Sequence, residues 1–575
     1  MKKALIIVAI LLVLLFALIA ILLNLHKSFT GASIGGVKEG SVLIVDLSKG
    51  FPERAGYDFS GFTFKKKNNF LSLILAIERG AEDEDIKSLV LRPGGSGFGL
   101  AQIQELTDAL EYFKSFDKRV YVHMNSAGMG EYLLASCADS IFLSPPGEIF
   151  FIGMGASQIF FGNAFDKLGI GFDVIQLGDY KGAAEMFTED GFTPPLRESL
   201  TQLVEGLFGN WIEEVSKARG LEYEETIALI DYGLFSSNEA LENGLVDGIE
   251  YPQEFRDRIL AMVDDDENRL VKVNRYISNK DLFSGSDKIA VIYGTGNIHT
   301  GESKGSPFGG QESIGSESFS EAIDDAAEDE EIVAIVLRVD SPGGSALASD
   351  IIWKSVVEAK ESKPVLVSMG SIAASGGYYI SMSADSIFCD PSTITGSIGV
   401  VFMRPYFEGL MDKAGLTTDT IYRGRLADEF ALDRPMSDEG FEALGRMMNL
   451  VYEEFTNKAA DGRGLGIDSL LELAEGRIWT GTDAVNNGLA DREAGLSDVI
   501  KVAAKMVGSD PEKMGVVIYP AEKSFFEMAF EMGGMKAKTA IPEPFGSIFE
   551  KNLQALEMYS PREILTLMPY VIEFE

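Results

Sequence analysis

Residues 76–92 read AIERGAEDEDIKSLVLR, and residues 322–338 read AIDDAAEDEEIVAIVLR. Ten of these 17 aligned positions are identical, and the two segments are 246 residues apart. Each segment has a helical pattern followed by an apolar run that is typical of a buried strand. This repetition predicts that the chain contains two copies of one α/β domain.

Further matches keep nearly the same spacing along the chain. ADSIF at 138–142 recurs at 384–388, and NGLVD at 243–247 is echoed by NGLAD at 487–491. A unit of this length is the size of a whole domain, far longer than a solenoid repeat. We therefore predict a first repeat over 40–265, a second repeat over 287–510 and a C-terminal extension over 515–575. The extension contains apolar clusters, so we expect it to pack on the body.

The second repeat shows the fold class most clearly. Strand-like segments at 289–293, 332–338 and 365–369 alternate with helical segments at 320–331 and 349–362. Alternation of this kind predicts an α/β fold with buried, mostly parallel strands.

The N-terminus predicts a membrane anchor over residues 1–27. Met1-Lys2-Lys3 precedes twenty uninterrupted apolar residues, 4–23. That length suits a transmembrane helix, whereas the apolar core of a cleaved signal peptide is shorter. The two lysines favour a cytoplasmic N-terminus, which would place the body beyond the membrane.

The composition excludes several classes of function. The 88 acidic residues outnumber the 50 basic ones, giving a net charge of −38. A nucleic-acid-binding protein needs clustered positive charge instead. Two cysteines and three histidines are too few for a disulfide framework and few for metal chemistry. We therefore expect no metal and no cofactor, and catalysis without histidine.

A candidate nucleophile follows the strand 365–369. Ser375 lies among small residues at the expected turn between this strand and a helix, with Gly376 behind it. Such a turn exposes a hydroxyl and offers backbone N–H groups to a developing oxyanion. The DSPGG segment at 340–344 ends the preceding strand and is positioned to supply a second donor.

A serine nucleophile needs a base, and a buried lysine can serve. The best candidate is Lys181, in the LGDYKGAAE segment at 177–185. Aligning the repeats places Ala427 opposite Lys181 and Met129 opposite Ser375, with Ser126 as a neighbouring alternative to Met129. Each repeat thus keeps one half of a dyad. This division predicts a composite site, formed either within one chain or between neighbouring chains.

Together, the anchor, the tandem repeat and three motifs resemble the signal peptide peptidase A family in its long form, peptidase family S49. The motifs are DSPGG at 340–344, SIAASGGY at 371–378 and GDYKGA at 178–183. The resemblance implies two tandem ClpP/crotonase-like domains, a serine protease with a Ser-Lys dyad, and a membrane-anchored oligomer, a tetramer. It implies the following roles: Ser375 as nucleophile, Lys181 as general base, Ser397 as the hydrogen-bond partner of the lysine, and Gly376 and Gly344 as oxyanion donors, with Gly343 as the alternative to Gly344.

The expected function is degradation of cleaved signal peptides at the bacterial cytoplasmic membrane, by a body on the extracytoplasmic side. One alternative is a protease of misfolded membrane or envelope proteins. Two non-protease alternatives are a crotonase-type acyl-CoA enzyme and an inactive membrane scaffold. A penicillin-binding-type S-x-x-K match at 115–118 is attributed to chance.

Overall fold

A computed structural model of the chain describes residues 37–54, 57–60, 63–66, 68–94, 97–279, 282–303, 312–520 and 564–568. The predicted anchor over 1–27 lies outside these residues. Among the residues that are described, no helix has the length and apolar character needed to cross a bilayer. The predicted extension over 515–575 is described only at 515–520 and 564–568.

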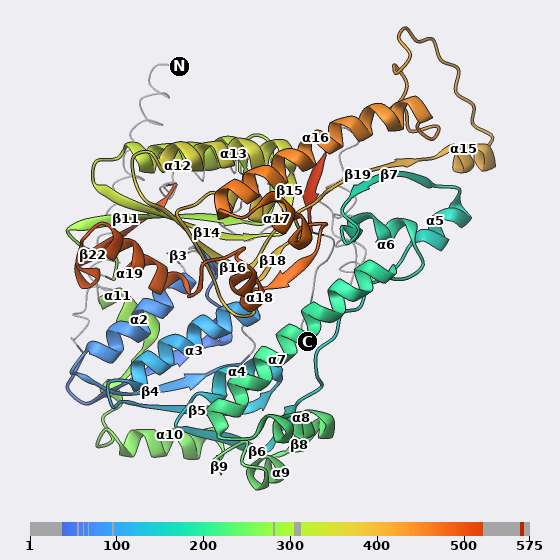
Figure 1. The fold of residues 1–575 in the computed structure, drawn as a ribbon. Coiled ribbons are helices and arrows are strands. Elements are labelled where there is room, and N and C mark those ends of the chain that lie inside the picture. The colour runs from blue at the N-terminus through green and yellow to red at the C-terminus, as the bar shows by residue number, and fades with distance from the viewer. Residues whose placement is uncertain are drawn as a thin grey trace, which may run out of the picture.

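The first repeat is built on a seven-stranded sheet (Figure 1). Its strands pair in parallel except for the last in the order, which is antiparallel to its neighbour. The order is β10 (Leu270–Lys272), β1 (Ser41–Asp46), β4 (Ile86–Arg92), β5 (Arg119–Ala127), β6 (Ser140–Phe150) and β8 (Leu234–Ser236), with β9 (Gly248–Ile249) also on β6.

The second repeat reproduces this order in an eight-stranded sheet, in which two shorter strands stand in the place of β6. Its order is β22 (Met514–Tyr519), β11 (Asp287–Thr295), β14 (Ile332–Ser341), β16 (Val365–Ala374), β18 (Ile394–Gly396) and β20 (Ile478–Thr480), with β17 (Ser386–Cys389) on β16 and β21 (Arg492–Glu493) on β17. Here too the last strand in the order is antiparallel to its neighbour. The predicted α/β class and the tandem repeat are confirmed.

Each sheet extends one strand past the predicted end of its repeat. Strand β10 begins after residue 265 and pairs with β1, and β22 begins after residue 510 and pairs with β11 in the same parallel manner. The start of the predicted extension is therefore β22, the edge strand beside β11, and its counterpart in repeat one is β10.

Some helices lie on the faces of the two sheets, and others lie away from them (Figure 1). Those of repeat one are α2 (Phe70–Glu82), α3 (Leu100–Lys114), α4 (Met129–Ser136), α5 (Gly162–Leu168), α6 (Glu185–Thr188), α7 (Pro194–Arg219), α8 (Tyr223–Tyr232), α9 (Ser237–Glu242), α10 (Pro252–Ala261) and α11 (Val273–Asn279). Those of repeat two are α12 (Ser316–Glu328), α13 (Ala346–Ala359), α14 (Gly376–Ser381), α15 (Glu408–Ala414), α16 (Asp438–Arg463), α17 (Ile467–Leu473), α18 (Gly481–Asn487) and α19 (Leu496–Met506).

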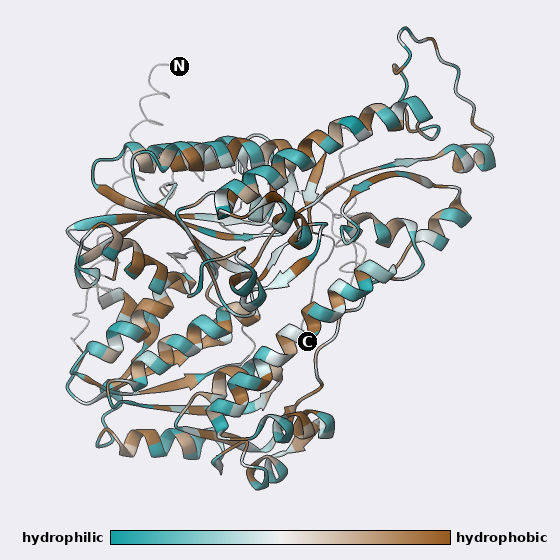
Figure 2. Ribbon diagram, viewed as in Figure 1, coloured by the Kyte–Doolittle hydropathy of each residue, from teal (hydrophilic) through white to brown (hydrophobic). Residues whose placement is uncertain are grey.

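The two repeats share a hydrophobic core. Helices α2, α3 and α19 lie between the sheets in Figure 1, and α3 contacts β16 while α19 contacts α2. Leu71 of α2 is buried in a cluster otherwise made of repeat-two residues, including Ile289 and Val291. Figure 2 shows the apolar residues concentrated along the strands and on the inward faces of these helices. Burial of this surface fixes one repeat against the other.

A third sheet combines both repeats and the C-terminal extension. Its order is β13 (Ser313–Gly315), β12 (Asn297–His299), β15 (Gly343–Ser345), β23 (Leu565–Leu567), β19 (Val400–Tyr406) and β7 (Gly171–Leu177). Strands β7 and β19 pair antiparallel over their whole lengths and project from the body as an arm (Figure 1). A separate hairpin joins β2 (Tyr57–Ser60) and β3 (Thr63–Lys66). The β7–β19 pairing carries the Lys181 segment of repeat one onto repeat two.

Candidate active site

Ser375 lies at the predicted turn, between the end of β16 and the start of α14. It is fully buried, with φ 56° and ψ −113°. A positive φ in a residue other than glycine is strained, and such strain is concentrated at functional sites. The turn is held by Ser375 N–H, which donates to Gly396 O at 2.7 Å, and by Tyr379 N–H, which donates to Ser375 O at 2.8 Å.

The hydroxyl of Ser375 faces the lysine instead of capping the helix. Its side chain makes no capping hydrogen bond to α14. Its Oγ lies 2.6 Å from Lys181 Nζ. The two predicted halves of the dyad therefore meet within one chain, one from each repeat.

Lys181 follows β7 and is fully buried. Its Nζ lies 2.7 Å from Ser397 O and 2.9 Å from Ser397 Oγ, in addition to Ser375 Oγ. All three partners are neutral oxygen atoms. Burial without an opposing charge disfavours the ammonium form and lowers the pKa of Lys181 well below its usual value near 10.5. The amine is thereby suited to accept a proton.

Ser397 occupies the turn after β18 and is fully buried. Its φ is 51°, a second strained backbone at the site. Its N–H donates to Arg477 O at 2.7 Å, which fixes the turn. Both the carbonyl and the hydroxyl of Ser397 are therefore directed at Lys181 Nζ.

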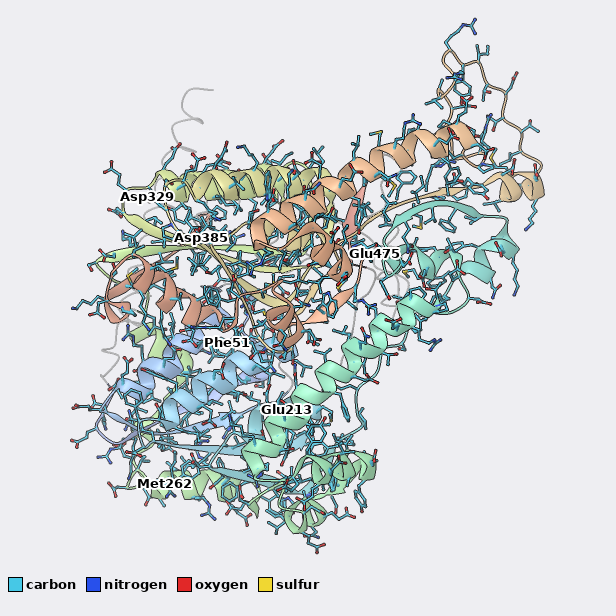
Figure 3. All side chains as sticks on the ribbon, in the orientation of Figure 1. Phe51, Glu213, Met262, Asp329, Asp385 and Glu475 are labelled. Atoms are coloured by element: carbon cyan, nitrogen blue, oxygen red, sulfur yellow. The ribbon has the colours of Figure 1, made fainter. Side chains whose placement is uncertain are left out.

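A segment from 475 to 477, which sequence reasoning missed, holds the lysine in place. Glu475 O accepts from Tyr180 N–H at 2.8 Å, and Gly476 N–H donates to Ile398 O at 2.8 Å. A Cβ at Gly476 would lie 2.6 Å from Lys181 Cβ, so only glycine fits there. Figure 3 labels Glu475 where elements of the two repeats come together. No local motif marks this segment, because only the fold brings it to the lysine.

The two glycines of the DSPGG segment differ in their surroundings. A Cβ at Gly343 would lie 2.6 Å from Gly376 N and 3.1 Å from Ser375 Cβ, whereas a Cβ at Gly344 would overlap Ile298 O. Gly343, the alternative, is therefore the glycine beside the Ser375 turn, and the expected Gly344 lies farther along β15. Gly343 N–H donates to Ser341 Oγ at 3.2 Å.

The equivalent positions in repeat one have no dyad. Met129 begins α4, and its carbonyl accepts from Trp211 Nε1 at 2.9 Å. The S-x-x-K match is also structural. Ser115 Oγ donates to Tyr112 O, and Lys118 Nζ donates to Gly80 O and Asp83 O.

His123 has a backbone partner, and the described acidic residues form no metal-type cluster. His123 Nε2 lies 3.0 Å from Glu250 O. Over those same residues, no group of three or more His, Cys, Asp or Glu side chains is arranged to hold a metal ion.

The chain is similar to known peptidases. The model of peptidase family S49 matches residues 112–263 and 358–510, once in each repeat. The chloroplastic serine protease SPPA of Arabidopsis thaliana is 32% identical over 81% of this chain and 69% of its own. Protease 4 of Salmonella typhi is 30% identical over 83% of this chain and 78% of its own. Protease 4 of Haemophilus influenzae is 29% identical over 78% of this chain and 75% of its own.

Among solved structures, a mutant of ClpP1 from Listeria monocytogenes aligns with 36% of this chain and 92% of its own. The identity is 13% and the TM-score 0.23. A superposition this loose leaves the ClpP/crotonase-like class a prediction.

Proposed function

Because the chain belongs to peptidase family S49 and is a serine peptidase, we propose that it is a membrane-anchored endopeptidase with a Ser375–Lys181 dyad that degrades cleaved signal peptides. The observation that carries the dyad is the 2.6 Å contact between Lys181 Nζ and Ser375 Oγ, fully buried. Family membership argues against a crotonase-type acyl-CoA enzyme. The intact pairing of both halves argues against an inactive scaffold.

The proposed mechanism uses the neutral amine as the base. Lys181 Nζ takes the proton of Ser375, and Oγ attacks the scissile carbonyl carbon. The N–H group of Gly376 and one N–H group of the Gly343-Gly344 pair stabilise the oxyanion. The ammonium then protonates the leaving amine as the peptide C–N bond breaks. The neutral lysine next takes a proton from the water that attacks the acyl carbon, and it returns this proton to Ser375 Oγ as the bond between Oγ and the acyl carbon breaks.

Ser397 is a positioning residue in this scheme. Its carbonyl and hydroxyl hold Nζ toward Ser375 throughout the cycle, the task that a carboxylate performs for histidine in a triad. Because neither group is charged, Ser397 holds the amine without raising its pKa as a carboxylate would.

Membrane anchoring and the substrate class are supported by the sequence. The twenty apolar residues 4–23 suit a single span with a cytoplasmic N-terminus, and a body on the extracytoplasmic side would meet signal peptides left in the membrane. The tetrameric state is proposed from the family resemblance. Degradation of misfolded membrane proteins is the alternative use of the same site.

We expect the purified full chain to prefer apolar peptides. A signal-peptide core and a polar peptide of equal length would be compared by kcat/KM, with Ser375→Ala as the control for contaminating proteases. An advantage of about tenfold or more for the apolar peptide corresponds to about 1.4 kcal/mol of differential transition-state binding. Equal cleavage of both peptides would rule out the preference.

A further inference from the structure

Arg477 lies directly before β20 and contacts both of the turns that surround the Lys181 amine. Its carbonyl oxygen accepts a hydrogen bond from Ser397 N–H at 2.7 Å, in the turn whose carbonyl and hydroxyl face the amine. This contact uses the main chain alone. The side chain of Arg477 contacts the other turn, the one that carries Lys181.

The guanidinium of Arg477 lies over the ring of Tyr180, the residue before Lys181. Its Cζ is 3.8 Å from the centroid of that ring, within the range of a cation–π contact. Arg477 Nη2 donates to Glu198 Oε1 at 2.9 Å, and Nη1 donates to Gln202 Oε1. Both acceptors lie on α7, so this helix holds the guanidinium in place over the ring.

Repeat one has the main-chain half of this arrangement and lacks the side chain. Strands β8 and β20 each end the strand order of their sheet and run antiparallel to their neighbour, and Gly233 precedes β8 as Arg477 precedes β20. Gly233 O accepts from Phe151 N–H at 2.7 Å, which matches the bond from Ser397 N–H to Arg477 O. The main-chain bond therefore belongs to the domain fold. Of the two repeats, only the one that carries Ser375 adds the guanidinium.

The contacts of the Arg477 side chain are better suited to fixing geometry than to stabilising the fold. The Glu198 side chain is 52% exposed, and an ion pair with an exposed partner contributes little to stability because water weakens it. Tyr180 is half-buried against the guanidinium, and the next residue along the chain carries the fully buried amine. Holding the Tyr180 ring therefore holds the main chain that leads into Lys181.

We propose that Arg477 is a positioning residue of the active site, which fixes the Lys181 turn of repeat one relative to the Ser397 turn of repeat two. Its carbonyl holds one turn and its guanidinium holds the other, so a single residue sets how the amine lies toward Ser375. The proposal rests on the proposed function, because the position of the amine matters to catalysis only if Lys181 is the base.

Replacing Arg477 by methionine is expected to lower kcat for peptide cleavage by about 10–100-fold and to leave KM within about twofold of the wild type. Methionine keeps the main-chain bond to Ser397 and removes the guanidinium, so the Tyr180 turn loosens and the base is misplaced. A misplacement of about 1 Å can cost about 100-fold in rate, and a misplaced base slows the chemical step without weakening peptide binding. Arg477→Lys returns a cation to the ring and is expected to recover kcat at least about threefold relative to Arg477→Met.

The matched control is Arg463→Met, at the end of α16. The Arg463 guanidinium also pairs with a carboxylate, donating to Asp491 Oδ1 at 2.6 Å, and its side chain is 6% exposed against 13% for Arg477. We expect kcat and KM of this variant to stay within about twofold of the wild type. Thermal unfolding of every variant checks the fold. A similar fall in kcat in both methionine variants would reveal a general effect on the fold and would overturn the proposal.

A double-mutant cycle with Tyr180→Leu tests the route through the ring. If Arg477 acts by holding Tyr180, the double variant Arg477→Met/Tyr180→Leu should be about as slow as the slower single variant, because both substitutions remove the same contact. Losses in kcat that multiply would overturn the proposal. Wild-type kcat in Tyr180→Leu would do the same, even if Arg477→Met failed to fold.

Ser375→Ala, assayed beside these variants, separates the proposal from the proposed function. If Ser375→Ala is inactive while folded Arg477→Met keeps the wild-type kcat, the positioning role is wrong and the dyad stands. If Ser375→Ala keeps full peptidase activity, the dyad itself is wrong and the role of Arg477 falls with it.

Discussion

Replacing Ser375 by alanine is expected to lower kcat/KM for peptide cleavage by about 10⁴–10⁶-fold, because loss of the nucleophile in serine proteases leaves only the contributions of binding and the oxyanion donors. Here Oγ is the one hydroxyl on the strained turn between β16 and α14, it lies 2.6 Å from the proposed base, and it makes no cap bond that alanine would break. The fold should therefore survive the change while catalysis does not.

The matched control for Ser375 is Ser371→Ala, in the same SIAASGGY segment but on β16. We expect its kcat/KM to stay within a few-fold of the wild type. Thermal unfolding of both variants checks that the fold is intact. A Ser375→Ala enzyme with a tenth or more of the wild-type activity would show that another group is the nucleophile.

Replacing Lys181 by methionine is expected to remove activity on a similar scale and to change how stability depends on pH. Burial lowers the pKa of Lys181 well below 10.5 in the folded chain, whereas the unfolded chain restores it to about 10.4. At a pH between the folded and the unfolded pKa of Lys181, this lysine carries a proton in the unfolded chain but not in the folded chain. The free energy of unfolding therefore rises with pH over this range. Lys181 therefore destabilises the fold at neutral pH. The destabilisation becomes smaller as the pH rises toward about 10.4, the pKa of lysine in the unfolded chain.

The measurement is urea unfolding of the wild type and Lys181→Met across that range. The difference in unfolding free energy, wild type minus variant, is expected to rise by about 1.4 kcal/mol per pH unit above the folded pKa and to level off near about pH 10.4. Groups common to both proteins cancel in the difference. Lys181→Arg is the control for activity: it keeps a cation that cannot act as a base, and it should also be inactive. A pH-independent difference would mean that the folded amine stays charged.

The sequence predicts the two domains and the dyad because their signals are strong. The repeat covers whole domains, so the two sheets with matching strand order follow from it. Ser375 is marked by a local strand–turn–helix pattern. Lys181 is marked by the alignment of the two repeats, in which repeat two has Ala427 opposite Lys181 and repeat one has Met129 opposite Ser375. Ser397 came only from the family resemblance, since a serine in a Gly-Ser-Ile-Gly turn has no distinguishing pattern of its own.

The parts that sequence reasoning missed depend on tertiary contacts. Gly343 and Gly344 have the same chemistry and both have positive φ, so only the approach of Ser375 and Ile298 tells them apart. Gly476 contacts a lysine that lies far earlier in the chain, in the other repeat. Strand β23 is only Leu-Thr-Leu, too short for any periodicity, and its partners on β15 are just as remote in sequence.

The most direct test of the central claim is the pH dependence of Ser375 modification by a small fluorophosphonate, followed by mass mapping of the labelled peptide. If neutral Lys181 activates Ser375, the adduct forms on Ser375, its rate rises with pH through a pKa well below 10.5, and Lys181→Met abolishes it. Labelling of another residue, or equally fast labelling of Ser375 in the Lys181→Met chain, would contradict the account.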